Sequence, residues 1–580
     1  MQRKSQLAIK VRYLAAGVAF VACLAGLSVG RGLPWPGRQP PPPSASAIAS
    51  VVSRARGSDA DVTSRRANIT AAEMLRWISA LYDIGERRPG TLAGHRAERY
   101  VAHFFSQAGL KDVHLDPIAV KVWQRTEWSL AVDGFDPAGP RWRPLPCFHI
   151  PYTAFTAPKG VKGELVYAQG DLASLASRAA ASPFGFSHHR SNLLPCFLPL
   201  DGGGARWGWS LLAGQVRGAL FGKILAADVR FASLAVNALR SIAYYTYDPD
   251  GTLPPGSART ATWLRPNFEA VYTLARDAGA AGFIGILADM PYRTNTYYAP
   301  HDGIFRPVPG LWLDRETGAW LREELKRRRM KANLKLTGST KPGLTHNVIG
   351  VVPGKSRECI IISCHHDSPF RSAVGNASGM AVTMALAKIF APEAKTSPTL
   401  RSFSEAALNR TLVFVASAGR FYGSIGTSAF VKRNPGLIRR AVVEISIENI
   451  AREFAPREGK PARPGLEPTG QVEPRTIFVS GSDAVRQIVR EAVEKYDLRR
   501  TFILPASSKL IGPHPPSDGA AYHAAGLPVI GLTSNPVYLL QAEDTLDKVA
   551  SDQLVPVALA FEQIIRALDK VPAATIRSAG

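Results

Sequence analysis

Cysteine is scarce in this sequence of 580 residues. The five cysteines stand at positions 23, 147, 196, 359 and 364, which is not the spacing of a disulfide framework, and at most Cys147 and Cys196 pair with each other. A small disulfide-stapled fold is therefore excluded. Cys359 and Cys364 flank a short apolar run, where we expect them on the buried face or edge of a strand.

The sequence also lacks the signatures of a nucleic-acid-binding protein. It has no zinc-finger spacing of Cys and His, no Walker phosphate loop, and no run of interleaved aromatic and basic residues. No nucleic-acid partner is expected, although 70 Lys and Arg against 46 Asp and Glu give a net charge of +24. That surplus favours an acidic surface, such as phospholipid or envelope polymer, with binding that weakens as salt rises. The basic run at 326–329 ends a helical pattern and is expected to be solvated surface.

Long stretches without charge are rare, and the one that stands out lies near the N-terminus. Residues 13–30 carry no charged side chain and follow a basic segment at 3–12. This length approaches the minimum for a membrane span, and the basic flank should stay in the cytoplasm. A cleaved signal peptide is the alternative, but the best small-residue site, at 45–47, lies far beyond the apolar stretch. We expect an uncleaved single-pass anchor, with the body on the periplasmic or extracellular side.

What is abundant is apolar surface for a folded core. Apolar residues make up 46% of the chain and charged residues 20%, which excludes wholesale disorder. Prolines clustered after residue 33 predict an extended spacer. The patterns divide the chain into a cytoplasmic tip and anchor at 1–31, a spacer at 32–69, the first part of a folded body at 70–122, an inserted region at 123–340, and the second part of the body at 341–580.

Helix and strand patterns in the body predict an α/β fold. A helix is expected after Thr70 as its cap, and a second over 93–108, ended by Gly109. Polar residues just past the ends of parallel strands should gather at one site. The expected strands are 348–352, 359–363, 412–416, 442–447, 477–479 and 529–532, with helices at 379–390, 424–432, 483–496 and 554–568; in the inserted region we expect strands at 163–167, 223–227 and 282–286 and a helix at 268–278.

Chemistry-bearing residues follow the strand at 359–363. They are Cys364-His365-His366-Asp367-Ser368, then Gly375-Asn376-Ala377-Ser378-Gly379 at the start of a helix. With residues 412–430, Ser517-Asp518 and Asp544-Thr545, they resemble the co-catalytic zinc aminopeptidase family, which includes bacterial leucine aminopeptidases and glutamate carboxypeptidase II. The resemblance implies a mostly parallel central sheet flanked by helices. The inserted region resembles a β-rich protease-associated domain, which covers the peptidase site in several relatives.

The chemistry that the resemblance implies needs two zinc ions about 3.5–4 Å apart. At an effective dielectric constant of 20, their mutual repulsion is on the order of 20 kcal/mol, so a bridging carboxylate and further anionic ligands are required. Where the family has His-x-Asp, this chain has His365, with Asp367 to orient the imidazole. Where the family has a later aspartate, Glu448 is a longer substitute.

The remaining family positions are replaced. Gly375 stands where the bridging aspartate is expected, and Leu540 where the last histidine is expected. Arg420 and Phe421 stand where a glutamate pair supplies the general base and a metal ligand. No Asp or Glu occurs at 368–392 or 406–441, so a shifted alignment does not restore these groups. The resemblance therefore implies no dinuclear centre, and at most a single zinc held weakly by His365 and Glu448.

Other polar residues near these segments have ordinary interpretations beside functional ones. Gly519 replaces the histidine of the family's Ser-Asp-His, and His523 is expected to pack rather than to replace it, with His514 beside it. Ser378 is expected to cap a helix, since no base is in place to make it a nucleophile.

The sequence therefore predicts a membrane-anchored, extracytoplasmic protein of peptidase fold that is catalytically inactive and binds a peptide or protein partner. Family relatives that are not peptidases, such as transferrin receptor and nicastrin, make this feasible by analogy. Arg420 could clamp a ligand carboxylate, with Asp518 and His523 as further binding residues. The alternative is a zinc-dependent exopeptidase or amidohydrolase with an atypical mononuclear site, and a purely structural role in a membrane assembly stays open.

Overall fold

The computed structural model describes residues 69–134, 141–168, 218–391, 408–457 and 465–578. The expected anchor at 13–30 and the spacer residues 32–68 lie outside the described residues, as does Cys196, the one candidate partner that the sequence offers for Cys147. Cys359 and Cys364 are free and buried, as the apolar run around them predicts.

Four parallel strands form the centre of the body, in the order β13 (Thr411–Ser417), β12 (Cys359–His365), β14 (Ala441–Ile447) and β19 (Val529–Ser534). Apart from the first residue of β13, these strands are buried along their whole length, which explains why they appear in the sequence as continuous apolar runs. The sheet as a whole is mixed, because β11 (Lys331–Val352) and β17 (Arg475–Val479) join this centre antiparallel. The expectation of a mostly parallel sheet is correct for the centre and wrong for its flanks.

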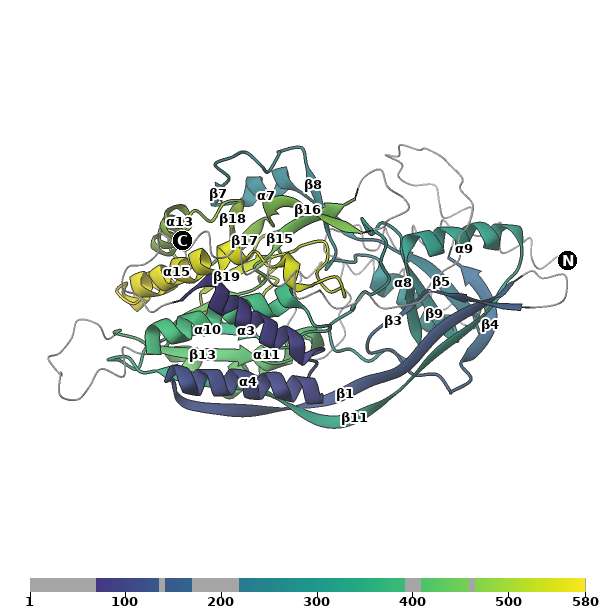
Figure 1. Cartoon of the computed structure of the whole chain (residues 1–580), viewed down its shortest axis with the longest axis horizontal. Helices are drawn as coiled ribbons and strands as arrows, with labels where there is room; N and C mark the ends of the chain where they lie inside the picture. Colours follow the sequence, from purple (N-terminus) through teal and green to yellow (C-terminus); the bar gives the residue numbers. More distant parts are fainter. Residues whose placement is uncertain (1–68, 135–140, 169–217, 392–407, 458–464, 579–580) are drawn as a thin grey trace. The chain divides into compact units, whose positions relative to one another are not determined.

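Two long strands, β1 (Lys111–Gly134) and β11 (Lys331–Val352), connect the body to the region at 123–340. They pair antiparallel along nearly their whole length, and β11 joins β13 at one end and β4 (Val161–Tyr167) at the other. Figure 1 shows this ribbon running from below α4 to β4. The boundaries expected at 122/123 and 340/341 thus fall inside two continuous strands.

Among the described residues of the region at 123–340, strands outnumber helices, as expected for a β-rich region. Its parallel strands β4, β5 (Ile224–Val229), β9 (Gly282–Leu287) and β10 (Gly310–Leu313) lie side by side. The elements around them are β2 (Arg141–Leu145), β3 (Phe148–His149), α8 (Phe268–Asp277) and α9 (Arg315–Arg327). The basic run at 326–329 lies at the end of α9, where Lys326, Arg327 and Arg329 are solvated as expected.

One segment of this region returns to the body. It contains β6 (Ala232–Ala235), α7 (Val236–Ile242), β7 (Tyr245–Tyr247) and β8 (Ala258–Ala261). β7 pairs with β18 (Thr501–Pro505) at the far edge of the sheet from β4, and Val236 and Leu253 pack with Phe502 in a small core. The chain therefore passes between the body and the region at 123–340 more often than a simple insertion requires.

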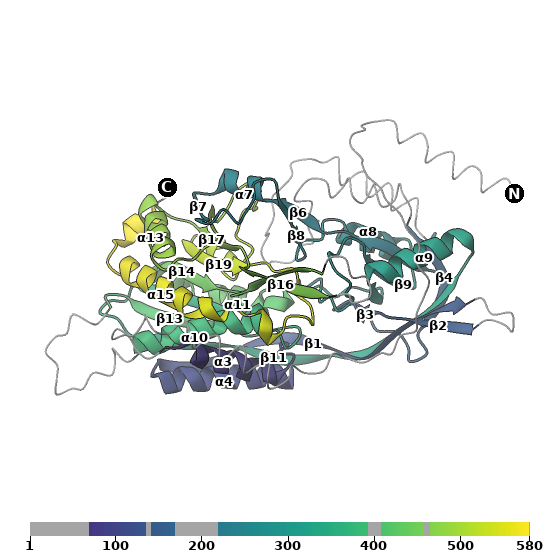
Figure 2. The ribbon, with the colours of Figure 1, turned by 45° about the horizontal axis from the view of Figure 1, so that its top comes forward.

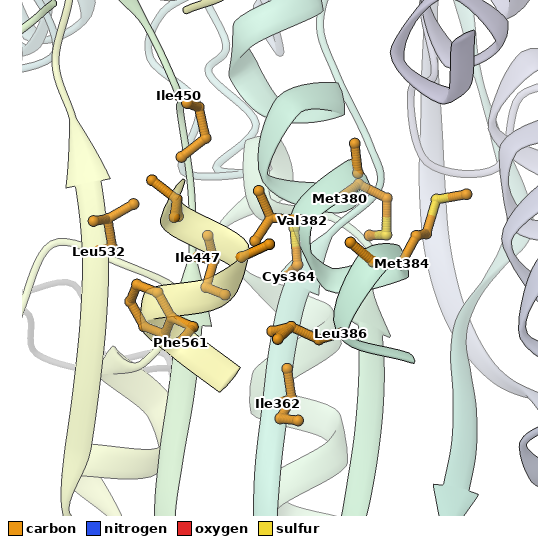
Figure 3. Packing of buried hydrophobic residues seen from close by; sticks show 14 of the residues in the cluster. Ile362, Cys364, Met380, Val382, Met384, Leu386, Ile447, Ile450, Leu532 and Phe561 are labelled. Carbon is orange, nitrogen blue, oxygen red and sulfur yellow. The ribbon is translucent and has the colours of Figure 1, made fainter. Parts of the chain in front are cut away.

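Helices cover both faces of the central strands. Side chains alternate along β12: Ile360, Ile362 and Cys364 pack in the main core, whereas Cys359 and Ile361 pack in a second core on the opposite face. In the main core, side chains of β12, β14 and β19 meet those of α10 and α15 (Figure 3). That face carries α3 (Ala71–Ile84), α4 (Leu92–Ala108), α10 (Gly379–Phe390), α13 (Asp483–Lys495) and α15 (Ser551–Leu568), and the other carries α11 (Ile425–Arg433), α12 (Pro435–Arg440) and α14 (Ala520–Ala524).

The first two helices begin and end where their sequence predicts. The Thr70 hydroxyl accepts a hydrogen bond from the Glu73 amide at 3.1 Å, and α4 ends at Gly109 in the left-handed conformation. Both helices lie along the same side of the body as α10 (Figure 2). The remaining elements are η2 (Ala373–Ser378), η5 (Arg420–Tyr422), β15 (Arg452–Pro456), β16 (Leu466–Val472), η6 (Leu546–Lys548) and α16 (Ala573–Arg577).

One helical segment of the described chain, Ala373–Phe390, is long and apolar enough to cross a membrane. It is 94% buried inside the fold, as the central helix of a core must be.

Candidate functional site

Buried polar side chains converge where β12, β13 and β14 end. His365 and Ser417 are the last residues of β12 and β13, and Glu448 follows β14 directly. The Ser417 hydroxyl donates to Asp518 Oδ2 at 3.2 Å, and the Asp518 amide donates to Glu448 Oε1 at 2.7 Å. We refer to His365, Asp367, Ser417, Arg420, Glu448 and Asp518 as the strand-end cluster.

His365 and Asp367 are bonded to each other. His365 Nδ1 lies 3.1 Å from the Asp367 carbonyl oxygen, and because a carbonyl only accepts, Nδ1 carries a proton. The same nitrogen is 3.5 Å from Asp367 Oδ1. Burial lowers the pKa of His365, but the bond to Asp367 and the charge of Asp518 outweigh it, so the pKa is raised above its usual value.

Asp367 also fixes the loop that carries Arg420. Its two carboxylate oxygens accept the backbone N–H groups of Arg420 at 3.0 Å and Phe421 at 3.1 Å. Burial raises the pKa of Asp367, but the bonds to His365 and to these amides reverse the effect and hold it below its usual value. The role expected for Asp367, orientation of the histidine, is therefore joined by a second one, positioning of the loop.

The Arg420 guanidinium lies against the two other carboxylates of the cluster. Its Nε is 3.5 Å from Asp518 Oδ1 and 3.9 Å from Glu448 Oε2. Nη1 donates to the Ser424 hydroxyl and Nη2 to the Pro516 carbonyl, each at 3.1 Å. Burial and the charge of Asp518 raise the pKa of Glu448, and Arg420 partly offsets this. Arg420 is thus the counter-cation of the cluster.

Asp544 holds the loop that contains Gly375. Asp544 accepts the amides of Val374 at 2.7 Å and Gly375 at 2.9 Å, and its burial raises its pKa to about 6 despite these bonds. A Cβ atom built on Gly375 would lie 2.9 Å from Leu539 Cδ1. A side chain at this position would therefore require the end of the Leu539 side chain to shift.

The capping role expected for Ser378 is wrong. Its hydroxyl donates to the Val374 carbonyl at 2.9 Å and accepts the Ile450 amide at 2.9 Å. Asn376 caps α10 instead, since its Oδ1 accepts the Gly379 amide at 3.1 Å. The pairing of β14 with β12 brings residue 450 close to Ser378, and the sequence alone does not show this contact.

Phe421 and Leu540 belong to an apolar cluster that comes mostly from the region at 123–340. The Tyr152 hydroxyl donates to the Phe421 carbonyl at 2.7 Å, and the Tyr298 amide donates to the Leu540 carbonyl at 2.9 Å. The Phe421 ring also meets the His365 ring edge-on, with centroids 5.2 Å apart. That region therefore lies directly on the two loops at 420–423 and 539–543.

His523 contacts His514, with their Nδ1 atoms 2.9 Å apart. Burial and the charge of His514 lower the pKa of His523 to about 4. The structure thus gives His523 a packing partner, as expected for it. Within the described ranges, three potential metal-ligand atoms come within 4.8 Å of one another only at His95, Glu98 and His346, on α4 and β11.

Sequence reasoning missed two polar residues around the cluster. Ser417 is hydrogen-bonded as described above, and Glu444 lies fully buried beneath the cluster, where burial raises its pKa well above the usual range. Ser363 donates to Glu444 Oε1 at 2.5 Å. A glutamate inside the apolar run 442–447 was the available signal, because a buried carboxyl needs a partner there.

Comparison with known proteins supports the fold. Residues 347–565 match the family described as Peptidase family M28. No curated protein matches the sequence significantly.

Solved structures that resemble the chain are peptidases. A Peptidase M28 precursor from Shewanella amazonensis SB2B aligns over 92% of this chain and 99% of its own, at 16% identity and a TM-score of 0.59. BSAP, a zinc aminopeptidase from Bacillus subtilis, aligns over 88% and 99%, at 16% identity and 0.54. An aminopeptidase from Aneurinibacillus sp. strain AM-1 aligns over 85% and 93%, at 18% identity and 0.52. At sequence identities this low, the similarity is evidence for a shared fold alone. Residues 347–565 thus carry a Peptidase family M28 domain, in a chain with the fold of the zinc aminopeptidases.

Proposed function

We propose that this protein has the peptidase fold without the peptidase reaction, and that it acts by binding a peptide or protein partner. The observation that carries the proposal is the place of Arg420. A guanidinium lies against Asp518 and Glu448 where the family's reaction depends on metal cations. The protein itself thus supplies a cation to the strand-end cluster.

The residues present do not fit a dinuclear zinc centre. His365 and Glu448 are the family's ligand positions that remain, and Gly375 stands where the family's bridging carboxylate is expected. A bridging side chain at Gly375 would collide with Leu539 unless that residue moved. Arg420 adds positive charge beside the remaining carboxylates, which raises the cost of placing a divalent ion there.

The same arrangement lacks a general base. A base has to reach the attacking water and be ready to accept its proton. Arg420 cannot accept one, and Phe421 is apolar. Glu448 and Asp518 already face Arg420, and Asp367 holds two backbone amides.

The region at 123–340, which lies on the loops at 420–423 and 539–543, supports a binding function in place of peptide hydrolysis. We interpret it as a protease-associated-like cover, whose apolar cluster includes Phe421 and Leu540. A partner would then contact the cover and the loop that carries Arg420. Arg420, with a side chain 21% exposed, is the proposed clamp for a ligand carboxylate. Asp518, whose Oδ1 lies 3.5 Å from Arg420 Nε, and His523 are proposed as further binding residues.

The proposed setting is the outer side of a membrane. Residues 13–30 would anchor the chain, and the net charge of +24 would help the body to hold an acidic surface. Release of the body from anionic vesicles by salt would support this part, and salt-independent binding would contradict it.

The experiment that tests the proposal measures metal content and hydrolysis together on the full, untagged chain. We expect no zinc that depends on His365 or Glu448, and no chelator-sensitive cleavage of aminoacyl or dipeptide reporters. A His365→Ala variant is the control. If wild-type protein cleaves the reporters and His365→Ala abolishes both cleavage and one equivalent of zinc, the second candidate function is correct.

That second candidate is a zinc-dependent exopeptidase or amidohydrolase with a mononuclear site. It is favoured by the retained pair of His365 and Asp367, since the proton on Nδ1 leaves Nε2 as the ligand atom of a neutral imidazole. Partner binding is tested separately with two peptide pools, one with free C-terminal carboxylates and one amidated. If Arg420 is a clamp, the free-carboxylate pool binds more tightly, and Arg420→Ala removes the difference.

A further inference from the structure

A second group of ligand-type side chains lies outside the strand-end cluster. His95 and Glu98 are one turn apart near the start of α4, and His346 is on β11. We refer to these three residues as the α4–β11 triad. Their potential ligand atoms all lie within 4.8 Å of one another.

Both imidazoles converge on one carboxylate oxygen. His95 Nδ1 and His346 Nδ1 each lie 2.8 Å from Glu98 Oε2. The two rings come from different elements, and their centroids are 5.8 Å apart. Two nitrogens and one oxygen therefore surround a single point, which is the donor set of a two-histidine, one-glutamate metal site.

Hydrogen bonds to the second carboxylate oxygen of Glu98, Oε1, orient the first, Oε2. Glu98 Oε1 accepts the Thr345 hydroxyl at 2.8 Å and the His346 amide at 3.0 Å. Hydrogen bonds of this kind around a ligating carboxylate fix its direction and strengthen metal binding. Oε2 is thereby held toward the two imidazoles.

The triad combines a buried anion with ligands that solvent can reach. The Glu98 side chain is 2% exposed, whereas those of His95 and His346 are 30% and 20% exposed. Burial raises the pKa of Glu98, but the charge of His366 and the bonds from His95, Thr345 and His346 outweigh it and lower that pKa to about 2. Glu98 is therefore an anion at neutral pH, and water can complete the coordination of an ion from the open side.

We propose that the α4–β11 triad binds a divalent transition-metal ion, with zinc as the favoured ion, through His95 Nδ1, His346 Nδ1 and Glu98 Oε2. Imidazole nitrogens suit zinc and its neighbours better than calcium or magnesium. Zinc ligands lie about 2.0–2.2 Å from the ion. Neighbouring ligand atoms are then about 3.4 Å apart, so small side-chain shifts from the observed separations admit the ion.

Binding would replace two N–H groups with one ion. In the absence of metal, both imidazoles donate to Glu98 Oε2. When the ion binds, the ligating Nδ1 atoms lose these protons or transfer them to the other ring nitrogen. The ion would tie helix α4 to strand β11, across 248 positions of sequence for the Glu98 and His346 pair, and stabilise the folded form through its binding free energy.

The test is cobalt and zinc titration of chelator-treated, untagged, full-length protein. Cobalt serves as the probe because an ion bound by imidazole and carboxylate at low coordination number shows visible absorption. We expect one equivalent bound, with a rise in the temperature of unfolding. His95→Ala should weaken the affinity at least tenfold, and His346→Ala similarly.

Two controls separate this site from other histidines. His103→Ala removes an exposed histidine of the same helix and should leave the affinity unchanged. His365→Ala alters the strand-end cluster and should also leave it unchanged. Because His95 is partly exposed, its substitution should not disturb folding, and circular dichroism checks this.

Each outcome decides between the sites. If the protein binds no cobalt, or if His95→Ala binds it as wild type does, the triad is only a hydrogen-bonded cluster and the proposal is overturned. If His365→Ala removes the binding instead, the ion lies in the strand-end cluster, and the proposed loss of the family's metal site is wrong as well. Loss in His95→Ala alone overturns neither proposal and supports this one.

Discussion

The strand-end cluster and the α4–β11 triad contain the same kinds of ligand groups, but their carboxylates are neutralised differently. In the cluster, Asp518 and Glu448 face the Arg420 guanidinium, and an apolar cover lies on the loop that carries it. In the triad, Glu98 faces two imidazoles that are partly open to solvent. We infer from this comparison that histidines and carboxylates are available to a metal ion only where the protein has not already supplied a cation.

Removal of Arg420 should have the largest effect. Arg420→Ala leaves Asp518 and Glu448, both nearly fully buried, without a counter-charge, and we expect a loss of about 3–5 kcal/mol in the free energy of unfolding. Chemical denaturation measures it. Arg433→Ala, which breaks a more exposed ion pair with Asp116, is the matched control and should cost about 0–1 kcal/mol.

The same variant sharpens the contrast between the sites. If the internal cation is what keeps metal out, Arg420→Ala should gain measurable zinc affinity that depends on Glu448. Equal stability losses for Arg420→Ala and Arg433→Ala would show that Arg420 does not balance the cluster.

Acidification should have the next largest effect, because it removes the stabilising charge of Glu98 in the α4–β11 triad. The pKa of Glu98 is depressed to about 2, so its stabilising contribution is complete above its ordinary pKa and is lost as pH falls through the depressed value. A shift from the usual 4.5 to about 2 corresponds to about 3 kcal/mol. We expect the unfolding free energy of wild type to fall more steeply between pH 5 and 2 than that of Glu98→Gln. Parallel slopes for the two proteins would contradict the shift.

Loosening the cover should have a smaller effect. Tyr152→Phe removes the hydroxyl that donates to the Phe421 carbonyl and lies 3.0 Å from the Tyr298 hydroxyl. An unpaired buried carbonyl costs about 1–3 kcal/mol, and amide exchange at 419–424 should accelerate. Tyr247→Phe removes an exposed hydroxyl bonded to Asp497 and serves as the control. Exchange at 419–424 that is unchanged in Tyr152→Phe would show that the cover does not hold this loop.

The smallest effect is expected on the solvated end of α9. Lys326 and its partner Glu323 are both more than half exposed, so Lys326→Ala should change the free energy of unfolding by less than about 0.5 kcal/mol. Thermal unfolding measures this change. A larger loss would mean that this run contacts something other than water.

Local patterns predicted the elements of the body well. The helix after Thr70, the end of α4 at Gly109, and the central strands β12, β13, β14 and β19 follow the sequence closely, because caps and buried apolar runs are local signals. The full lengths of β1 and β11 were missed, and β18 as well. The exposed stretches of β1 and β11 are polar, and their stability comes from pairing with each other across more than two hundred residues.

The candidate site residues also divide into those that the sequence predicted and those that only the fold revealed. The positions of His365, Asp367 and Glu448 at or just past strand ends follow from the sequence pattern, and the structure joins His365 to Asp367 and Glu448 to Asp518. The triad was missed, although His95 and Glu98 at a spacing of three residues on a helix offered a signal. Their partner His346 comes from a distant strand, and no local pattern connects it to α4.

By itself, the sequence determined which residues are apolar, where the first two helices begin and end, and that Gly375, Arg420 and Phe421 stand where the family resemblance places carboxylates. Only the tertiary structure decided that Arg420 lies between the remaining carboxylates, that the region at 123–340 covers Phe421 and Leu540, and that Glu98 meets two imidazoles. The physical reason is the distance along the sequence over which each kind of interaction acts. Backbone conformation responds to neighbours a few residues away, whereas charge balance and burial depend on groups that only folding brings together.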